Sequence, residues 1–68
     1  MSDLGVGTIA CDTRVNRVVT IKGATKRQTN IVNGHAATVA VEYTVYYERD
    51  GHAVEERNVP AAVLVATA

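Results

Sequence analysis

Hydrophobic and polar residues alternate most regularly between residues 37 and 48. The odd positions are apolar or aromatic: Ala37, Val39, Val41, Tyr43, Val45 and Tyr47. The even positions are mostly polar: Thr38, Ala40, Glu42, Thr44, Tyr46 and Glu48. Successive side chains of a strand point to opposite faces, so the segment predicts a strand with one face on a core and one toward water. At roughly 3.3 Å per residue it spans about 40 Å, so it either bends or extends beyond the core.

The Asn33-Gly34 dipeptide predicts a tight hairpin before this strand, because both residues tolerate positive φ. A two-residue turn there pairs Val32 with His35, Thr29 with Thr38, and Gln28 with Val39. The same register places Arg27 diagonal to Glu42, where a cross-strand ion pair is expected.

Asp50-Gly51 predicts a second hairpin, followed by a mostly polar strand over residues 52–59. A two-residue turn at this point puts Glu56 opposite Val45, on the face assigned to the core. A carboxylate does not fit among apolar side chains. The conflict indicates a bulge, a longer loop, or an edge strand that carries charge to block unwanted pairing.

The remaining strands are less regular. We expect strands over residues 4–11, 17–22 and 25–32, with Gly23-Ala24 separating the last two. Residues 61–66, which follow Pro60, are apolar on both faces, as in a strand that is buried on both sides or held in an interface. The whole chain, residues 1–68, is therefore predicted to be one all-β domain. Its five to six antiparallel strands would form a meander curled into a small barrel or sandwich.

Composition supports the all-β prediction and limits what one copy can bury. Twelve Val, three Ile and eight Thr make about a third of the chain β-branched, whereas Leu occurs twice and Phe and Trp are absent. A chain of 68 residues is marginal alone. Its single cysteine, Cys11, forms no internal disulfide and is interpreted as a buried thiol. Association of several copies is the stabilising device left open, and we assign the contact to Tyr46, Val63, Leu64 and Val65.

Charge is sorted along the chain although it sums to zero. Residues 1–34 carry +3 and residues 35–68 carry −3. Opposite ends can therefore attract each other within one fold or between copies. The cations of the first half form the candidate anion site, for a nucleotide or a nucleic-acid phosphate: Arg14, Arg17, Lys22, Lys26 and Arg27. The alternative interpretation is a solvated basic strand that pairs with the acidic strand after it.

Catalytic and metal-binding patterns are not found. The only serine is Ser2, and His35 and His52 each sit at a predicted turn with nothing to bring them to Cys11. Metal-ligand spacings, a phosphate loop and a dinucleotide fingerprint are missing as well, so we expect no enzyme, metal or cofactor. No secretory signal or membrane span is recognised, and with one cysteine we expect an intracellular, cytoplasmic protein without membrane contact.

These features favour a non-enzymatic binding and assembly module that acts through contacts with its own copies or with another protein. Small viral or bacterial accessory proteins have this character, by analogy only. The alternative function is anion binding, in which the basic segment 14–30 holds a nucleotide or a nucleic-acid phosphate.

Overall fold

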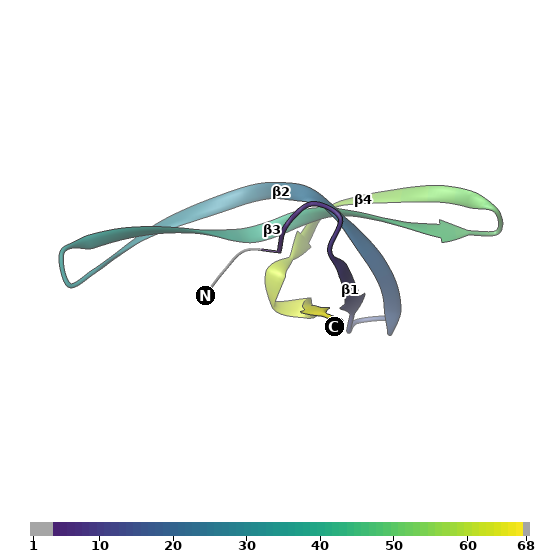
Figure 1. Cartoon of the computed structure of the whole chain (residues 1–68), viewed down its shortest axis with the longest axis horizontal. Helices are drawn as coiled ribbons and strands as arrows, with labels where there is room; N and C mark the ends of the chain where they lie inside the picture. The colour runs from purple at the N-terminus through teal and green to yellow at the C-terminus, as the bar shows by residue number, and fades with distance from the viewer. Residues whose placement is uncertain (1–3, 68) are drawn as a thin grey trace.

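A computed structural model describes residues 4–67, which form one antiparallel sheet in the order β4-β3-β2-β1-β5. The elements are β1 (Ile9–Asp12), β2 (Arg17–Val32), β3 (His35–Arg49), β4 (His52–Pro60), the 3-10 turn η1 (Ala61–Val63) and β5 (Leu64–Ala66). The all-β antiparallel prediction is confirmed. The first four strands form a meander, but β5 returns to pair with β1 instead of continuing it (Figure 1). Within residues 4–67 the sheet stays open, with β4 and β5 as its edges, and forms no closed barrel.

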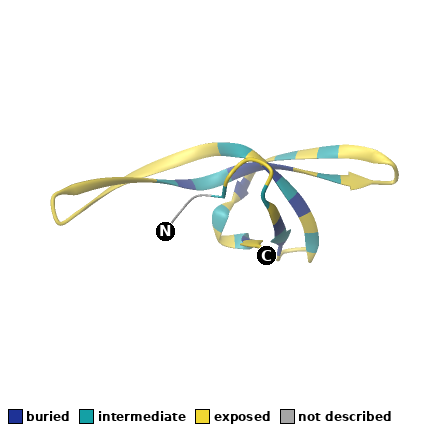
Figure 2. Ribbon diagram, in the orientation of Figure 1, coloured by how far each residue is buried: buried dark blue, intermediate teal, exposed yellow. Residues whose placement is uncertain are grey.

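The molecule is elongated because β2 and β3 run far beyond the other strands (Figure 1). Its extents are 49 × 20 × 19 Å, and its Cα radius of gyration is 13.1 Å. A compact domain of this length has a radius of gyration of about 11 Å. The far half of the β2–β3 hairpin, residues 25–38, is exposed at every position (Figure 2). We call these residues the arm.

The core lies where all five strands overlap, a region we call the hub (residues 9–24, 40–47 and 55–66). Its buried apolar residues come from every strand: Ala10, Val19, Ile21, Ala40, Tyr43, Val45, Val59 and Leu64. The core positions predicted at Tyr43 and Val45 are confirmed, since both are almost fully buried, but Ala40 and Thr44, assigned to the opposite face, are buried as well. Ala37 has the same parity as Tyr43 but lies on the exposed arm, so the strand does extend beyond the core.

Both predicted hairpin turns are present, and both are two residues long. Asn33 and Gly34 have φ values of 52° and 78°, and Asp50 and Gly51 have the same pair of values. Positive φ at both central positions defines the type I′ turn that matches the twist of the strands. The predicted register is confirmed for Val32–His35, Thr29–Thr38 and Gln28–Val39. The Thr29 and Thr38 hydroxyls are 2.9 Å apart and hydrogen-bond across the arm.

The predicted break at Gly23-Ala24 is wrong, because β2 continues through it as one strand. Register shifts between Ile21 and Gly23, and again on both sides of Lys26, accommodate the extra residues as β-bulges. Arg27 keeps its expected place opposite Ala40, two residues from Glu42 along β3, and the shift beyond it sets Lys26 directly opposite Glu42.

The charge conflict on β4 is resolved at the edge of the sheet. Glu56 lies opposite Val45, as the two-residue turn requires, on a strand with no neighbour on its other side among residues 4–67. A register shift then follows between Tyr43 and Val45, and Asn58 there has φ of 58°. The extra residue turns Val59 toward the core, where it is 1% exposed.

Two predicted strands are shorter than expected. Residues 4–8 form no strand, and the Leu4 N–H donates a 2.9 Å hydrogen bond to the Tyr43 hydroxyl instead. Residues 61–63 form η1, because the chain after Pro60 must turn from the β4 edge to reach β1 at the other side of the sheet. Only Leu64–Ala66 remain as a strand.

The small core makes Ile21 a sensitive position. We expect Ile21→Ala to lower the free energy of unfolding by about 2–5 kcal/mol, through lost burial and the cavity left behind. Val15→Ala, at an exposed position in the β1–β2 turn, is the matched control and should change stability by less than about 0.5 kcal/mol. Urea denaturation followed by circular dichroism measures both, and equal effects of the two substitutions would contradict the assigned core.

Candidate functional site

The face of the hub opposite the core carries a row of exposed apolar side chains. Residues paired directly across strands share a face. Two adjacent rows of three paired residues therefore lie together on this face: Val65–Cys11–Val18 and Ile9–Thr20–Tyr46. We call these six residues the outer face. Its large apolar members are well exposed: Ile9 by 44%, Val18 by 63%, Tyr46 by 43% and Val65 by 55%.

The residues predicted to form an interface divide between the two sides of the sheet. Tyr46 and Val65 lie on the outer face, on strands β3 and β5, which are far apart in the sheet order. Leu64 is buried in the core, and Val63 packs against the core from η1. The Val63 carbonyl accepts hydrogen bonds from the Thr13 amide at 2.8 Å and from the Thr13 hydroxyl at 3.0 Å.

A hollow of about 300 Å³ lies beside the outer-face side chains of Val18 and Tyr46. Its remaining lining residues are Thr20, Tyr47, Glu48 and Ala53. The hollow is thus bordered by one carboxylate, two tyrosines, one threonine and two small apolar side chains. Such a surface suits an aliphatic side chain from a partner.

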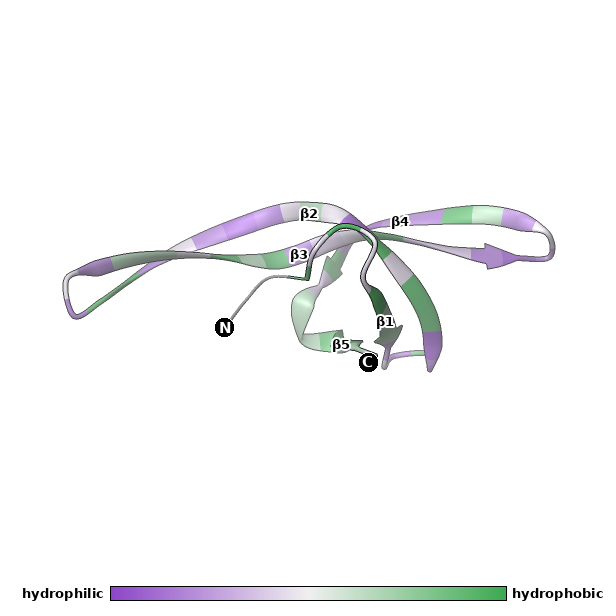
Figure 3. Ribbon diagram, viewed as in Figure 1, coloured by the Kyte–Doolittle hydropathy of each residue, from purple (hydrophilic) through white to green (hydrophobic). Residues whose placement is uncertain are grey.

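The arm presents aliphatic residues near its tip, small residues behind them, and the longer polar side chains of Lys26, Arg27 and Gln28 toward its base. Ile31 is 76% exposed and Val32 is 60% exposed. Behind the tip, the side chains on both faces are short: Thr29, Ala36, Ala37 and Thr38. Figure 3 shows a hydrophobic stretch near the end of the arm, between a polar stretch of β2 and the hydrophilic turn itself. Short side chains let another protein surface approach closely.

The cations proposed for anion binding lie at separate places. Arg14, in the β1–β2 turn, donates to both Asp12 carboxylate oxygens, from Nε at 3.0 Å and from Nη2 at 2.7 Å. The same Nη2 atom is 2.7 Å from Glu56 Oε2 on β4. The Asp12 hydrogen bond, and after it the Glu56 bond, raises the pKa of Arg14. The ion pair between Arg14 and Glu56 compensates the negative charge of Glu56 next to the core.

Arg17 and Lys22 also have partners within the chain. The Arg17 guanidinium lies 4.1 Å from the centre of the Tyr47 ring, a cation–π contact. Lys22 Nζ lies 2.8 Å from Glu55 Oε1 on the outer side of the sheet, and this bond lowers the pKa of Glu55. The pairs Arg14–Glu56 and Lys22–Glu55 therefore join the basic and acidic halves of the sequence within one chain.

Lys26 and Arg27 lie on the arm, beyond the hub, where both residues are exposed. The arm carries these two cations and no acidic residue. The five proposed cations thus occupy the β1–β2 turn and its neighbouring rim, the bulged part of β2, and the base of the arm. They do not converge on one point.

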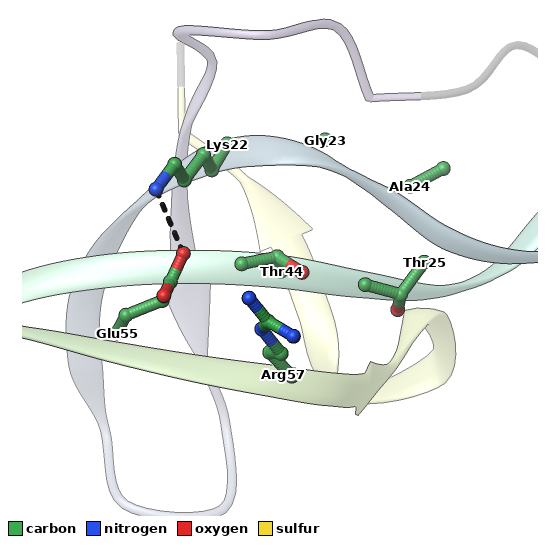
Figure 4. Close-up of a pocket in the computed structure, with 7 residues that line it drawn as sticks. All are labelled: Lys22, Gly23, Ala24, Thr25, Thr44, Glu55 and Arg57. Carbon is green, nitrogen blue, oxygen red and sulfur yellow. Dashed lines mark hydrogen bonds and ion pairs between the residues drawn. The ribbon is translucent and has the colours of Figure 1, made fainter.

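The sequence analysis missed Arg57, which lies in a second hollow on the outer side of the sheet. This hollow, of about 350 Å³, is lined by Lys22, Gly23, Ala24, Thr25, Thr44, Glu55 and Arg57. Figure 4 shows the Arg57 guanidinium beside Thr44, between Glu55 and Thr25, with Lys22 reaching to Glu55 from β2. Arg57 occurs in an acidic stretch and was therefore not assigned to the basic site. The Asn-Val-Pro sequence that follows it is a signal that could have indicated a bulge here, because asparagine tolerates the backbone conformation that a bulge requires.

Cys11 and the two histidines lie in separate parts of the fold. The Cys11 thiol is on the outer face and donates a hydrogen bond to Asn16 Oδ1 at 3.6 Å. Cys11 is half-exposed, so the prediction of a buried thiol is wrong. His35 follows the turn of the arm, and His52 follows the turn at the end of the β3–β4 hairpin. Among residues 4–67 there is no cluster of three or more side chains able to hold a metal ion.

Comparisons of the chain with models of known protein families, with curated proteins and with solved structures found no match. In the described part of the chain, no helix has the length and apolar character needed to cross a membrane.

Asp12 makes stability depend on pH. Its carboxylate is almost fully buried, and the hydrogen bond from Arg14 holds the pKa of Asp12 below its ordinary value of 3.8. A lowered folded-state pKa stabilises the fold above the unfolded-state pKa, and this contribution is lost as the pH falls through 3.8 toward the folded-state value.

We therefore expect Asp12→Asn to lower the free energy of unfolding by about 1–3 kcal/mol at neutral pH and to flatten its decline in acid. Asp50→Asn, at an exposed turn whose positive φ asparagine also accepts, is the control. Denaturation series between acid and neutral pH measure both. If the free energy of unfolding of Asp12→Asn falls as steeply in acid as that of the native chain, Asp12 is not the source of the pH dependence.

Proposed function

We propose that the chain is a non-enzymatic assembly module, in which the arm of one copy covers the outer face of another. The observation that carries this proposal is the exposure of all residues from 25 to 38. An isolated two-stranded hairpin is at best marginally stable in water. An arm of this length gains its stability when a partner covers it.

The chain exposes enough surface area beyond that of a typical monomer to form one protein interface of standard size. The chain exposes 4813 Å². A folded monomer of 7.2 kDa exposes about 4,100 Å². The excess of about 700 Å² is close to the roughly 800 Å² that each partner buries in a standard protein interface.

The chemistry of the arm favours a second copy as its partner. The tip residues Ile31 and Val32 are aliphatic, and the hollow beside Val18 and Tyr46 accepts side chains of this kind. The arm is basic, whereas Glu48 borders that hollow. The arm points away from its own hub (Figure 1), so only another molecule can bring the two surfaces together.

Anion binding along residues 14–30 remains the alternative. It is supported by Lys26 and Arg27 on the arm, which could contact a nucleotide or a nucleic-acid backbone. It is weakened by the intramolecular partners of Arg14, Arg17 and Lys22. The assembly proposal needs no change in those contacts.

Analytical ultracentrifugation tests the assembly. We expect the native chain to sediment as an oligomer at high micromolar concentration. The double variant Ile31→Asp/Val32→Asp should be a folded monomer, because charges at the arm tip oppose burial in an apolar hollow. Val15→Asp, an equally exposed apolar position outside both surfaces, should leave the oligomer intact.

Mixing distinguishes this contact from a simple pairing of two outer faces. Val18→Asp removes the receiving surface but keeps the arm, whereas the double arm variant keeps the receiving surface. Each variant alone should be monomeric, and the mixture should form a complex through one intact arm and one intact face. A native chain that stays monomeric, or a mixture without any complex, would overturn the proposal.

A further inference from the structure

Irregularities of two strands, β2 and β4, meet on the outer side of the sheet around Thr44 of β3. On β2, Lys22 and Thr25 are the extra residues of two bulges, since neither has a directly opposed residue on β3. On β4, the shift between Tyr43 and Val45 sets Arg57 and Asn58 against the single residue Thr44. Bulges re-aim side chains and are frequent beside functional sites.

The bulge at Asn58 has a structural role, which is to turn Val59 into the core. That role explains the backbone but not the choice of residues around the hollow. Asn58 is also one of the few non-glycine residues with positive φ, and the only described one outside the loops. A residue held in this region is a reason to look for function nearby.

Hydrogen-bond donors line this hollow from three directions. Arg57 reaches it from β4, Thr44 forms part of its wall from β3, and Lys22 and Thr25 approach from β2 (Figure 4). Thr44 is only 8% exposed, and its side chain forms part of the wall of the hollow, where its hydroxyl can donate to a bound ligand.

The charges in the hollow leave a positive balance. Lys22 and Arg57 contribute two positive charges and Glu55 one negative charge. Glu55 is bound to Lys22 and also lies within the electrostatic reach of Arg57, and Arg57 supplies the fork of donors that a ligand in the hollow would meet. The space beside Gly23 is open, because no atom lies within 4 Å of the position that a Cβ atom would occupy there.

We infer that this hollow binds a tetrahedral oxyanion of the phosphate type, with Arg57, Thr44 and Thr25 as its main donors. Donors that converge from three strands suit a tetrahedral group better than a planar carboxylate, which a single arginine fork already satisfies. The site shares Thr25 with the base of the arm, but it uses neither the arm tip nor the apolar outer-face side chains of the proposed assembly. It also differs from the anion site predicted from the sequence, which did not include Arg57.

Nuclear magnetic resonance titration of the native chain tests this site. Inorganic phosphate, adenosine monophosphate and acetate are added at constant ionic strength, so that general screening is the same. Phosphate should cause saturable shifts of the Gly23, Thr25 and Thr44 amides and of the Arg57 side-chain N–H. Acetate should cause much smaller ones. Tighter binding of the monophosphate than of free phosphate would identify an organic phosphate as the ligand, and equal binding would identify the free ion.

Two variants make the result specific. Arg57→Gln should weaken phosphate binding by roughly tenfold or more, whereas Arg49→Gln, at the far end of β3, should leave it unchanged. Glu55→Gln removes the carboxylate that opposes the anion and releases Lys22, so it should strengthen binding by up to roughly fivefold.

The inference fails if the shifts do not saturate, if acetate reproduces them, or if Arg57→Gln binds phosphate as the native chain does. None of these outcomes tests the proposed assembly, because sedimentation of the same variants measures the oligomeric state separately. Native-like spectra of Arg57→Gln in the absence of phosphate confirm that the variant is folded.

Discussion

The limited reach of the core decides the shape of this molecule. Apolar side chains are buried only in the hub, where short strands β1 and β5 and the last part of β4 meet β2 and β3. The two long strands continue without any covering layer. Hydrophobic burial, the main favourable term in folding, therefore acts on part of the chain only. The arm is held together by its ladder, its type I′ turn and the Thr29–Thr38 contact, and these weak local terms leave its surface available to a partner.

Bulges let one sequence serve both faces of such a thin sheet. Without the extra residue at Asn58, Val59 would share the face of Arg57, and the core would lose one of its almost fully buried side chains. On β2, Ile21 faces the core, and Lys22, the extra residue that follows it, reaches Glu55 outside. Charge follows the same division, because Arg14 bridges the carboxylates of Asp12 and Glu56 on the core side and Lys22 meets Glu55 on the other. The core side is thus apolar with a paired rim, and the outer side carries the surfaces offered for binding.

Local signals in the sequence were sufficient for the hairpins and insufficient for the bulges. Asn33-Gly34 and Asp50-Gly51 each require a particular turn, and the register near a two-residue turn follows directly from it. The clash between Glu56 and Val45 was also visible, and the edge position of β4 was among its expected solutions. Gly23-Ala24 was misread as a break because a bulge keeps the strand continuous while shifting its parity. Arg57 was missed for the same reason, since its neighbours across the sheet depend on shifts that only long-range packing determines. The path of residues 61–66 likewise depends on where β1 lies.

Amide hydrogen exchange of the arm, measured as a function of protein concentration, distinguishes a covered arm from an uncovered one, because exchange reports the local stability of each hydrogen-bonded segment. We expect backbone amides in residues 25–38 to exchange quickly in dilute solution and to become protected as concentration rises, while amides at Val19, Ile21 and Val45 change little by comparison. Arm amides with the same exchange rates at every concentration would contradict the proposed assembly, since the arm would then have no partner among its own copies.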